Sequence, residues 1–112
     1  MTIKVSRLVP GSQLTNATAT YYTTPVNTSA VVKRAVFCNT TGLAATITVY
    51  VVPSGGAAGV TNEIIAAYSI AAGASYVSPE LAGVVLGPGD TLQALSGTNA
   101  AVTIVVSGIT VV

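Results

Sequence analysis

The chain has 112 residues, the usual size of one compact domain, and we therefore predict a single domain over residues 1–112. Only 6% of the residues are charged and 51% are hydrophobic, whereas about a quarter of an ordinary soluble domain is charged. Four basic residues are too few to neutralise a run of phosphates, which argues against nucleic acid as a partner. So little charge gives little repulsion between copies, and we expect a homo-oligomer or burial in a larger assembly.

Apolar residues recur with a period of two along most of the chain, and Val, Ile, Thr and Tyr are the residue types that favour strands. No segment has the spacing of an amphipathic helix. In chain order, the pattern predicts strands over residues 2–9, 18–24, 30–38, 45–52, 63–70, 75–79, 91–95 and 102–112.

The first two predicted strands carry side chains that suit an interface. Lys4 and Arg7 belong either to an ordinary first strand or to an arm that grips a neighbouring subunit. Tyr21 and Tyr22 are adjacent in the second strand, so one should face the core and the other solvent or a partner.

Residues 30–38 and 45–52 form the strongest predicted hairpin, because the Asn, Thr and Gly residues of the link at 39–42 favour a turn. The adjacent cations Lys33 and Arg34 lie in its first strand and are candidates for contact with another subunit. All basic residues fall in the first half of the chain and all acidic ones in the second. Ion pairs within or between subunits would explain this separation, and so would chance.

Alternation is clearest in residues 45–52. Three apolar side chains of this strand should face the core and three others should face outward. The inward set is Ile47, Val49 and Val51, and the outward set is Thr46, Thr48 and Tyr50. Tyr50 is therefore another candidate interface residue.

The connecting segments are rich in turn-forming residues, and residues 53–59 should form a flexible excursion because Pro53 ends strand pairing and several glycines follow. The last strand, residues 102–112, is apolar on both faces and has a possible bulge at Gly108, so it is either central in a sheet or paired across a subunit boundary. About eight short strands with regular turn signals predict an all-β fold, an antiparallel β-sandwich or jelly roll.

The residues of common catalytic and metal sites are scarce. Histidine is absent, which removes the usual general base and the commonest metal ligand. The three acids, Glu63, Glu80 and Asp90, lie far apart in the sequence, and Cys38 is a single cysteine best interpreted as a small buried hydrophobe. We therefore predict no enzyme, no cofactor and no metal site.

Two long uncharged stretches, residues 35–62 and 91–112, are too often interrupted by Gly, Ser, Thr and Asn to predict a membrane-spanning helix. No apolar segment or cleavage site of the signal-peptide kind follows the basic residues near the N-terminus. We expect no membrane partner and synthesis in a reducing cytoplasm, which also suits a chain with one cysteine.

Several segments from residue 35 to residue 112 together form a recognisable series. They are residues 35–42 (AVFCNTTG), 46–56 (TITVYVVPSGG), 62–65 (NEII), 79–81 (PEL) and 86–95 (LGPGDTLQAL), with the closing strand 102–112 after them. In kind and order they resemble small structural proteins of tailed bacteriophages.

This resemblance implies a virion component of the capsid-decorating (cement) or tail-associated sort, assembled in symmetric oligomers, with a homotrimer as the expected form. It implies the major capsid protein or another virion protein as partner, and synthesis in a bacterial host. The alternative hypothesis is a host-adhesion module that binds carbohydrate through exposed tyrosines and the loop at residues 53–61.

Overall fold

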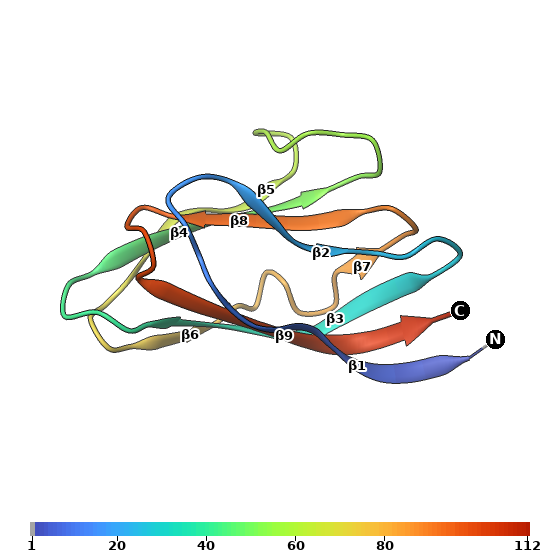
Figure 1. Cartoon of the computed structure of the whole chain (residues 1–112), viewed down its shortest axis with the longest axis horizontal. Helices are drawn as coiled ribbons and strands as arrows, with labels where there is room; N and C mark the ends of the chain where they lie inside the picture. The colour runs from blue at the N-terminus through green and yellow to red at the C-terminus, as the bar shows by residue number, and fades with distance from the viewer. Residues whose placement is uncertain (1) are drawn as a thin grey trace.

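The computed structural model describes residues 2–112, and within that range the chain forms nine strands and no helix (Figure 1). The strands are β1 (Ile3–Gln13), β2 (Ala19–Thr23), β3 (Ser29–Asn39), β4 (Ala45–Val52), β5 (Glu63–Ile70), β6 (Ser75–Val77), β7 (Val85–Leu86), β8 (Thr91–Ser96) and β9 (Val102–Val111). All the predicted strands are present. The additional strand, β7, has two residues and lies in a segment that the sequence pattern assigns to a connection.

The strands form two antiparallel sheets that lie face to face, which confirms the predicted β-sandwich (Figure 1). Sheet A has the order β1-β9-β3-β6, with β7 also paired to β3. Sheet B has the order β2-β8-β4-β5. Each sheet therefore combines strands from the beginning and the end of the chain.

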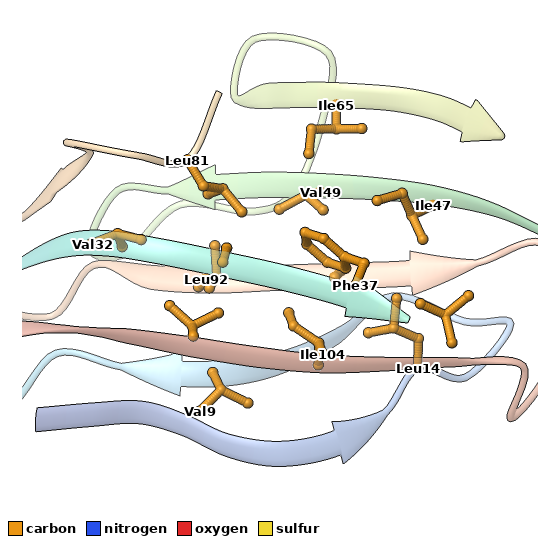
Figure 2. Packing of buried hydrophobic residues seen from close by; sticks show 14 of the residues in the cluster. Val9, Leu14, Val32, Phe37, Ile47, Val49, Ile65, Leu81, Leu92 and Ile104 are labelled. Carbon is orange, nitrogen blue, oxygen red and sulfur yellow. The ribbon is translucent and has the colours of Figure 1, made fainter. Parts of the chain in front are cut away.

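A continuous apolar core fills the space between the sheets, because every second residue of the long strands points inward. Figure 2 shows Phe37 of β3 and Ile47 and Val49 of β4 projecting into this space. The largest fully buried side chains are Phe37, Leu14, Ile47, Leu81, Leu86, Leu92, Ile104, Val9, Val32, Val49, Val52 and Val102. Burial of such side chains stabilises a fold by about 1.5–3 kcal/mol each.

The predicted hairpin of residues 30–38 and 45–52 is wrong, because β3 lies in sheet A and β4 in sheet B. The link between them crosses the sandwich, and the fully buried Asn39 fixes the crossing. Its side-chain amide donates hydrogen bonds to the Leu43 and Ile70 carbonyl oxygens, at 2.7 and 3.0 Å. Its Oδ1 accepts a hydrogen bond from the Thr41 N–H at 3.0 Å. The Asn, Thr and Gly residues of the link do reverse the chain, but they make an arch between the two sheets and not a hairpin within one.

The last strand, β9, is central in sheet A, between β1 and β3, which is one of the two predicted alternatives. The predicted bulge lies beside Gly108 and not at it. Gly108 pairs with Val32, and the next pair is Ser107 with Arg34, so Lys33 is the extra residue. Gly108 lies so close to β3 that a Cβ atom there would overlap the Val31 carbonyl oxygen.

The predicted alternation of β4 holds, since Ile47 and Val49 are buried in the core and Val51 is half-buried against it. The pattern did not show that Val52, which points the opposite way, is also buried. The segment between β4 and β5 rises over the outer side of sheet B (Figure 1). Its backbone returns to β4 through the hydrogen bond from the Val51 N–H to the Asn62 carbonyl oxygen.

Candidate binding surface

The cationic candidates lie on sheet A and the tyrosine candidates on sheet B. Lys4 and Arg7 are exposed on β1, and Lys33 and Arg34 are exposed on β3. Tyr21 and Tyr22 lie on β2 and Tyr50 on β4, and all three are half-buried. The fold therefore divides the seven residues that the sequence analysis selected into two groups, one on each sheet.

The outer face of sheet A is built from rows of directly paired residues, which share one face of the sheet. One row crosses four strands and is wholly apolar: Val5 pairs with Ile109, Ile109 with Val31, and Val31 with Val85. A second apolar row joins Val105 of β9 to Val36 of β3 and Val77 of β6.

These apolar side chains are open to solvent at the margins of the sheet. The exposed fraction is 86% for Val5, 64% for Val85 and 48% for Val77. We call the two rows, together with Ile3 and Val111 at the end of the sheet, the apolar face. An apolar surface built from contiguous strands is characteristic of a site that another protein covers.

A cationic row lies between the two apolar rows. Arg7 pairs with Ser107, and Ser107 pairs with Arg34, so both guanidinium groups project from the middle of the apolar face. The bulge residue Lys33 is exposed next to them. Lys4 lies in a different row. It pairs with Thr110, and Thr110 also pairs with the buried Ala30, so this row faces the side of sheet A opposite the apolar face.

The acidic residues are engaged elsewhere. The Asp90 carboxylate accepts hydrogen bonds from the Ser54 and Gly87 N–H groups, at 2.9 and 2.8 Å, and so fastens the turn before β8. Glu80 accepts hydrogen bonds from the hydroxyl groups of Tyr76, at 2.6 Å, and of Ser78, at 3.1 Å. These contacts occupy both carboxylates with backbone and hydroxyl donors, and the third acidic residue, Glu63, pairs with Tyr50 in sheet B.

The outer face of sheet B has a different chemistry. Its rows include Thr48 beside Leu95, and Tyr50 beside Gln93 and Thr20. Burial and the neighbouring Glu63 carboxylate raise the pKa of Tyr50. This face is rich in hydroxyl and amide groups, which water solvates well, and it contrasts with the Val- and Ile-rich face of sheet A.

The expectation that Tyr21 and Tyr22 point to opposite faces is wrong. A register shift between Thr20 and Tyr22 marks a β-bulge, which breaks the simple alternation of β2. Both rings are half-buried and pack against the core. The Tyr21 hydroxyl accepts a hydrogen bond from the Thr15 N–H at 3.3 Å, and burial raises the pKa of Tyr22. These rings therefore seal one edge of the sandwich.

The other edge is covered by a stacked pair of tyrosines, whose proximity the sequence does not predict. Tyr68 of β5 and Tyr76 of β6 have ring centroids 4.1 Å apart and lie on strands of different sheets. Phe37 lies behind Tyr76, at 6.4 Å between centroids. Three aromatic residues spaced widely in sequence gave no local signal, because only the sandwich brings them together.

Cys38 is half-buried and not fully buried as expected. It pairs with Thr103 and Ser75 in sheet A, and so belongs to an outward row, while its neighbours Phe37 and Asn39 point inward. Within residues 2–112 we find no pocket and no group of three or more Cys, Asp or Glu side chains placed to hold a metal ion. None of the elements described by the structure is a helix long and apolar enough to cross a membrane.

The apolar face could have been foreseen in part. The signal is the run of Val and Ile at both odd and even positions of residues 102–112, which is apolar on both faces. The sequence could not show which strands flank it, because β1, β3, β6 and β7 reach their places only through the sheet order.

The chain matches no protein-family model and no curated protein. Its fold is similar to that of a chain in the structure of infectious bursal disease virus strain Gx, with a TM-score of 0.50 and 17% identity over 98% of this chain and 32% of that one. Chains of strain Gt and of the T13 viral particle give TM-scores of 0.45 and 0.48, with 14% and 13% identity over 96% and 97% of this chain and 35% and 30% of theirs. This chain thus spans about a third of the length of those chains. Identity this low shows a common fold alone.

Proposed function

We propose that this protein is a structural component of a virus particle and that it acts by packing its apolar face against another particle protein. The observation that carries the proposal is the composition of that face, on which two apolar rows flank Arg7 and Arg34. The likeness in fold to a chain of a virus structure supports it. In this role the protein works by contact and not by catalysis.

The finer form of the proposal is a cement protein on the capsid of a tailed bacteriophage, as the resemblance in sequence suggests. A standard interface buries about 800 Å² on each partner, and apolar burial stabilises by about 25 cal/mol per Å² before ordering costs are subtracted. Repetition of such a contact over a symmetric shell would reinforce the particle. The homotrimer expected from the resemblance stays a prediction, which mass measurement on the purified protein tests.

The partner surface follows from the chemistry of the apolar face. It should be apolar with carboxylate groups at the positions that meet Arg7 and Arg34, because burial of unpaired guanidinium groups is costly. The major capsid protein is our proposed partner.

The test is binding of the purified protein to particles that lack it, measured by co-sedimentation. The double variant Val77→Lys with Val85→Lys places two ammonium groups on the exposed margins of the apolar face. We expect its affinity for the particle to fall by at least about tenfold, since desolvating two unpaired charges costs more than 1.4 kcal/mol. Because both side chains are exposed, thermal stability should change little.

Val26 and Val60 supply a matched control, since they are exposed valines outside the apolar face. The double variant Val26→Lys with Val60→Lys should bind as the unmodified protein does. Equal loss in both double variants would contradict the proposed surface. An image reconstruction then decides the location: density at regular sites on the capsid exterior supports a cement protein, and density confined to the tail contradicts it.

A further inference from the structure

Strand β1 is a free edge of sheet A, and its first half is regular. It pairs with β9 without a register shift from Ile3 to Arg7, whereas shifts occur after Arg7 and after Val9. The Thr2 N–H donates to the Val112 carbonyl oxygen at 3.0 Å, and the Val112 N–H donates to the Thr2 carbonyl oxygen at 2.9 Å. In an antiparallel ladder such pairs alternate, so Lys4 and Ser6 also direct their backbone groups toward β9.

The same alternation turns the backbone N–H and C=O groups of Ile3, Val5 and Arg7 away from β9, along the open side of the sheet. The exposed fractions of the Ile3 and Val5 side chains, 61% and 86%, show that no segment within residues 2–112 covers this stretch. A regular row of unpaired backbone groups beside apolar side chains is a template for another strand.

The other edges of the two sheets are irregular or short. β2 has five residues and a bulge, β6 has three residues and β7 has two. β5 has register shifts against β4, and Ala67 within it has a φ of 47°. These are the features by which proteins prevent strand addition. Among the described strands, the first half of β1 is the edge that is neither short nor irregular, and its protection against strand addition is limited to the charges of Lys4 and Arg7.

We propose that residues 3–7 of β1 pair antiparallel with the same residues of a second copy, about a two-fold axis at Val5. Val5 then lies opposite Val5 of the second copy, and Ile3 lies opposite Arg7 of the second copy. In each copy, Ile3, Val5 and Arg7 have backbone groups that face the open edge. These residues would exchange up to about six backbone hydrogen bonds with those of the second copy. This inference goes beyond the proposed function, and it sets a two-fold pair against the homotrimer that the resemblance implies. The mass of the purified chain decides between the two.

The register follows from backbone direction and charge. An axis at Ser6 would bring together residues whose backbone groups already face β9. An axis at Lys4 or Arg7 would place a cation directly opposite its own copy, which is destabilising. The axis at Val5 pairs all three residues whose backbone groups face the open edge, and it sets each cation opposite an uncharged side chain.

A two-fold axis perpendicular to the sheet keeps the outer faces of both copies on one side. The apolar row Val5–Ile109–Val31–Val85 then continues into the same row of the second copy. The dimer therefore presents two apolar faces side by side, in position to contact one partner surface.

The mass of the purified full chain tests the pairing, measured by analytical ultracentrifugation over a range of concentrations. We expect a monomer–dimer equilibrium. Val5→Pro removes an N–H that β9 does not use and should raise the dimer dissociation constant by at least about tenfold. Val5→Thr, which keeps the N–H and the β-branched shape, should remain dimeric. A monomer at all concentrations, or a trimer, would overturn the inference.

Cysteine cross-linking tests the register and does not depend on how well Val5→Pro folds. In a Cys38→Ser background, Val5→Cys should give a disulfide-linked dimer on oxidation, because directly opposed Cα atoms lie about 5.5 Å apart. Ile3→Cys in the same background should not, since Ile3 and its copy would be about 13 Å apart. Equal cross-linking of the two variants, or of neither, would overturn the register. Particle binding is measured separately, so failure of the pairing is distinguishable from failure of the proposed function.

Discussion

At the scale of single residues, the clearest electrostatic feature is the contact between Tyr76 and Glu80. The hydrogen bond from the tyrosine hydroxyl to Oε1 lowers the pKa of Glu80. Burial, and then the adjacent Glu80 carboxylate, raise the pKa of Tyr76 to about 12. Tyr76 also stacks on Tyr68, so this contact helps to hold β6 of sheet A against β5 of sheet B.

The two shifts predict how this contact responds to pH. The lowered pKa of Glu80 contributes stability that is present above the ordinary value of 4.5 and is lost as the pH falls through the lowered value. The raised pKa of Tyr76 contributes stability that is present below pH 10 and is lost as the pH rises from 10 to about 12.

Thermal unfolding of the unmodified chain and of Tyr76→Phe as a function of pH checks this prediction. Near neutral pH the variant should be less stable by about 1 kcal/mol, because it lacks one partly exposed charge-assisted hydrogen bond. The difference should shrink at both acidic and alkaline pH. Parallel stability curves would show that Glu80 and Tyr76 are not coupled.

At the scale of elements, the connection from β3 to β4 decides that the chain forms a sandwich. Asn39 ends β3 with its side chain fully buried, and its amide donates hydrogen bonds to the carbonyl oxygens of Leu43 in the link and of Ile70 at the end of β5 in sheet B. A local turn would have sufficed for a hairpin. The arch instead requires a polar side chain that satisfies buried backbone groups, since leaving them unpaired is costly.

Asn39→Ala should therefore reduce the free energy of unfolding by about 2–3 kcal/mol, because one buried and one partly buried carbonyl oxygen lose their donor. Thr40→Ala is the matched control, since Thr40 is exposed and its hydroxyl makes one hydrogen bond, to the Ala101 carbonyl oxygen. We expect that control to lose less than about 1 kcal/mol. Urea denaturation of both variants measures the difference, and comparable losses would refute the role given to Asn39.

At the scale of the whole molecule, the two outer faces of the sandwich differ in chemistry. Sheet B presents hydroxyl and amide groups, and sheet A presents valine and isoleucine rows around a pair of arginines. The cations of β1 and β3 all lie on sheet A, and Glu63 and Asp90 lie on or beside strands of sheet B. This difference in chemistry is the basis on which we propose that the outer face of sheet A contacts another particle protein.

The cationic row predicts a salt dependence. Arg34→Gln should weaken binding to the particle several-fold and make the affinity less sensitive to ionic strength, because it removes a charge from the proposed contact surface. Lys4→Gln removes the same charge from a row that faces the other side of sheet A, and should leave both quantities nearly unchanged. Co-sedimentation at several salt concentrations measures the effect. An identical response of the two variants would contradict the placement of the cationic row on the interface.

The strands were predictable because their signals are local. The bounds of β4 and β5 agree with the predicted ranges 45–52 and 63–70, since alternating side chains set each strand by themselves. The partners of each strand were not predictable, and the hairpin prediction failed for that reason. Likewise, the bulge at Tyr21 depends on the pairing of β2 with β8, which no pattern within β2 reveals.

The sequence by itself determined the fold class, the strands and a surface poor in charge, because alternation and composition act residue by residue. Only the tertiary structure decided which side chains share a face. Sheet order brings β1, β9, β3, β6 and β7 together. Because side chains alternate along each strand, one set of side chains from each of these strands then lies on the outer face of the sheet. The apolar face and its cationic row exist because residues far apart in the chain are paired across strands, and pairing over long separations leaves no trace in local sequence.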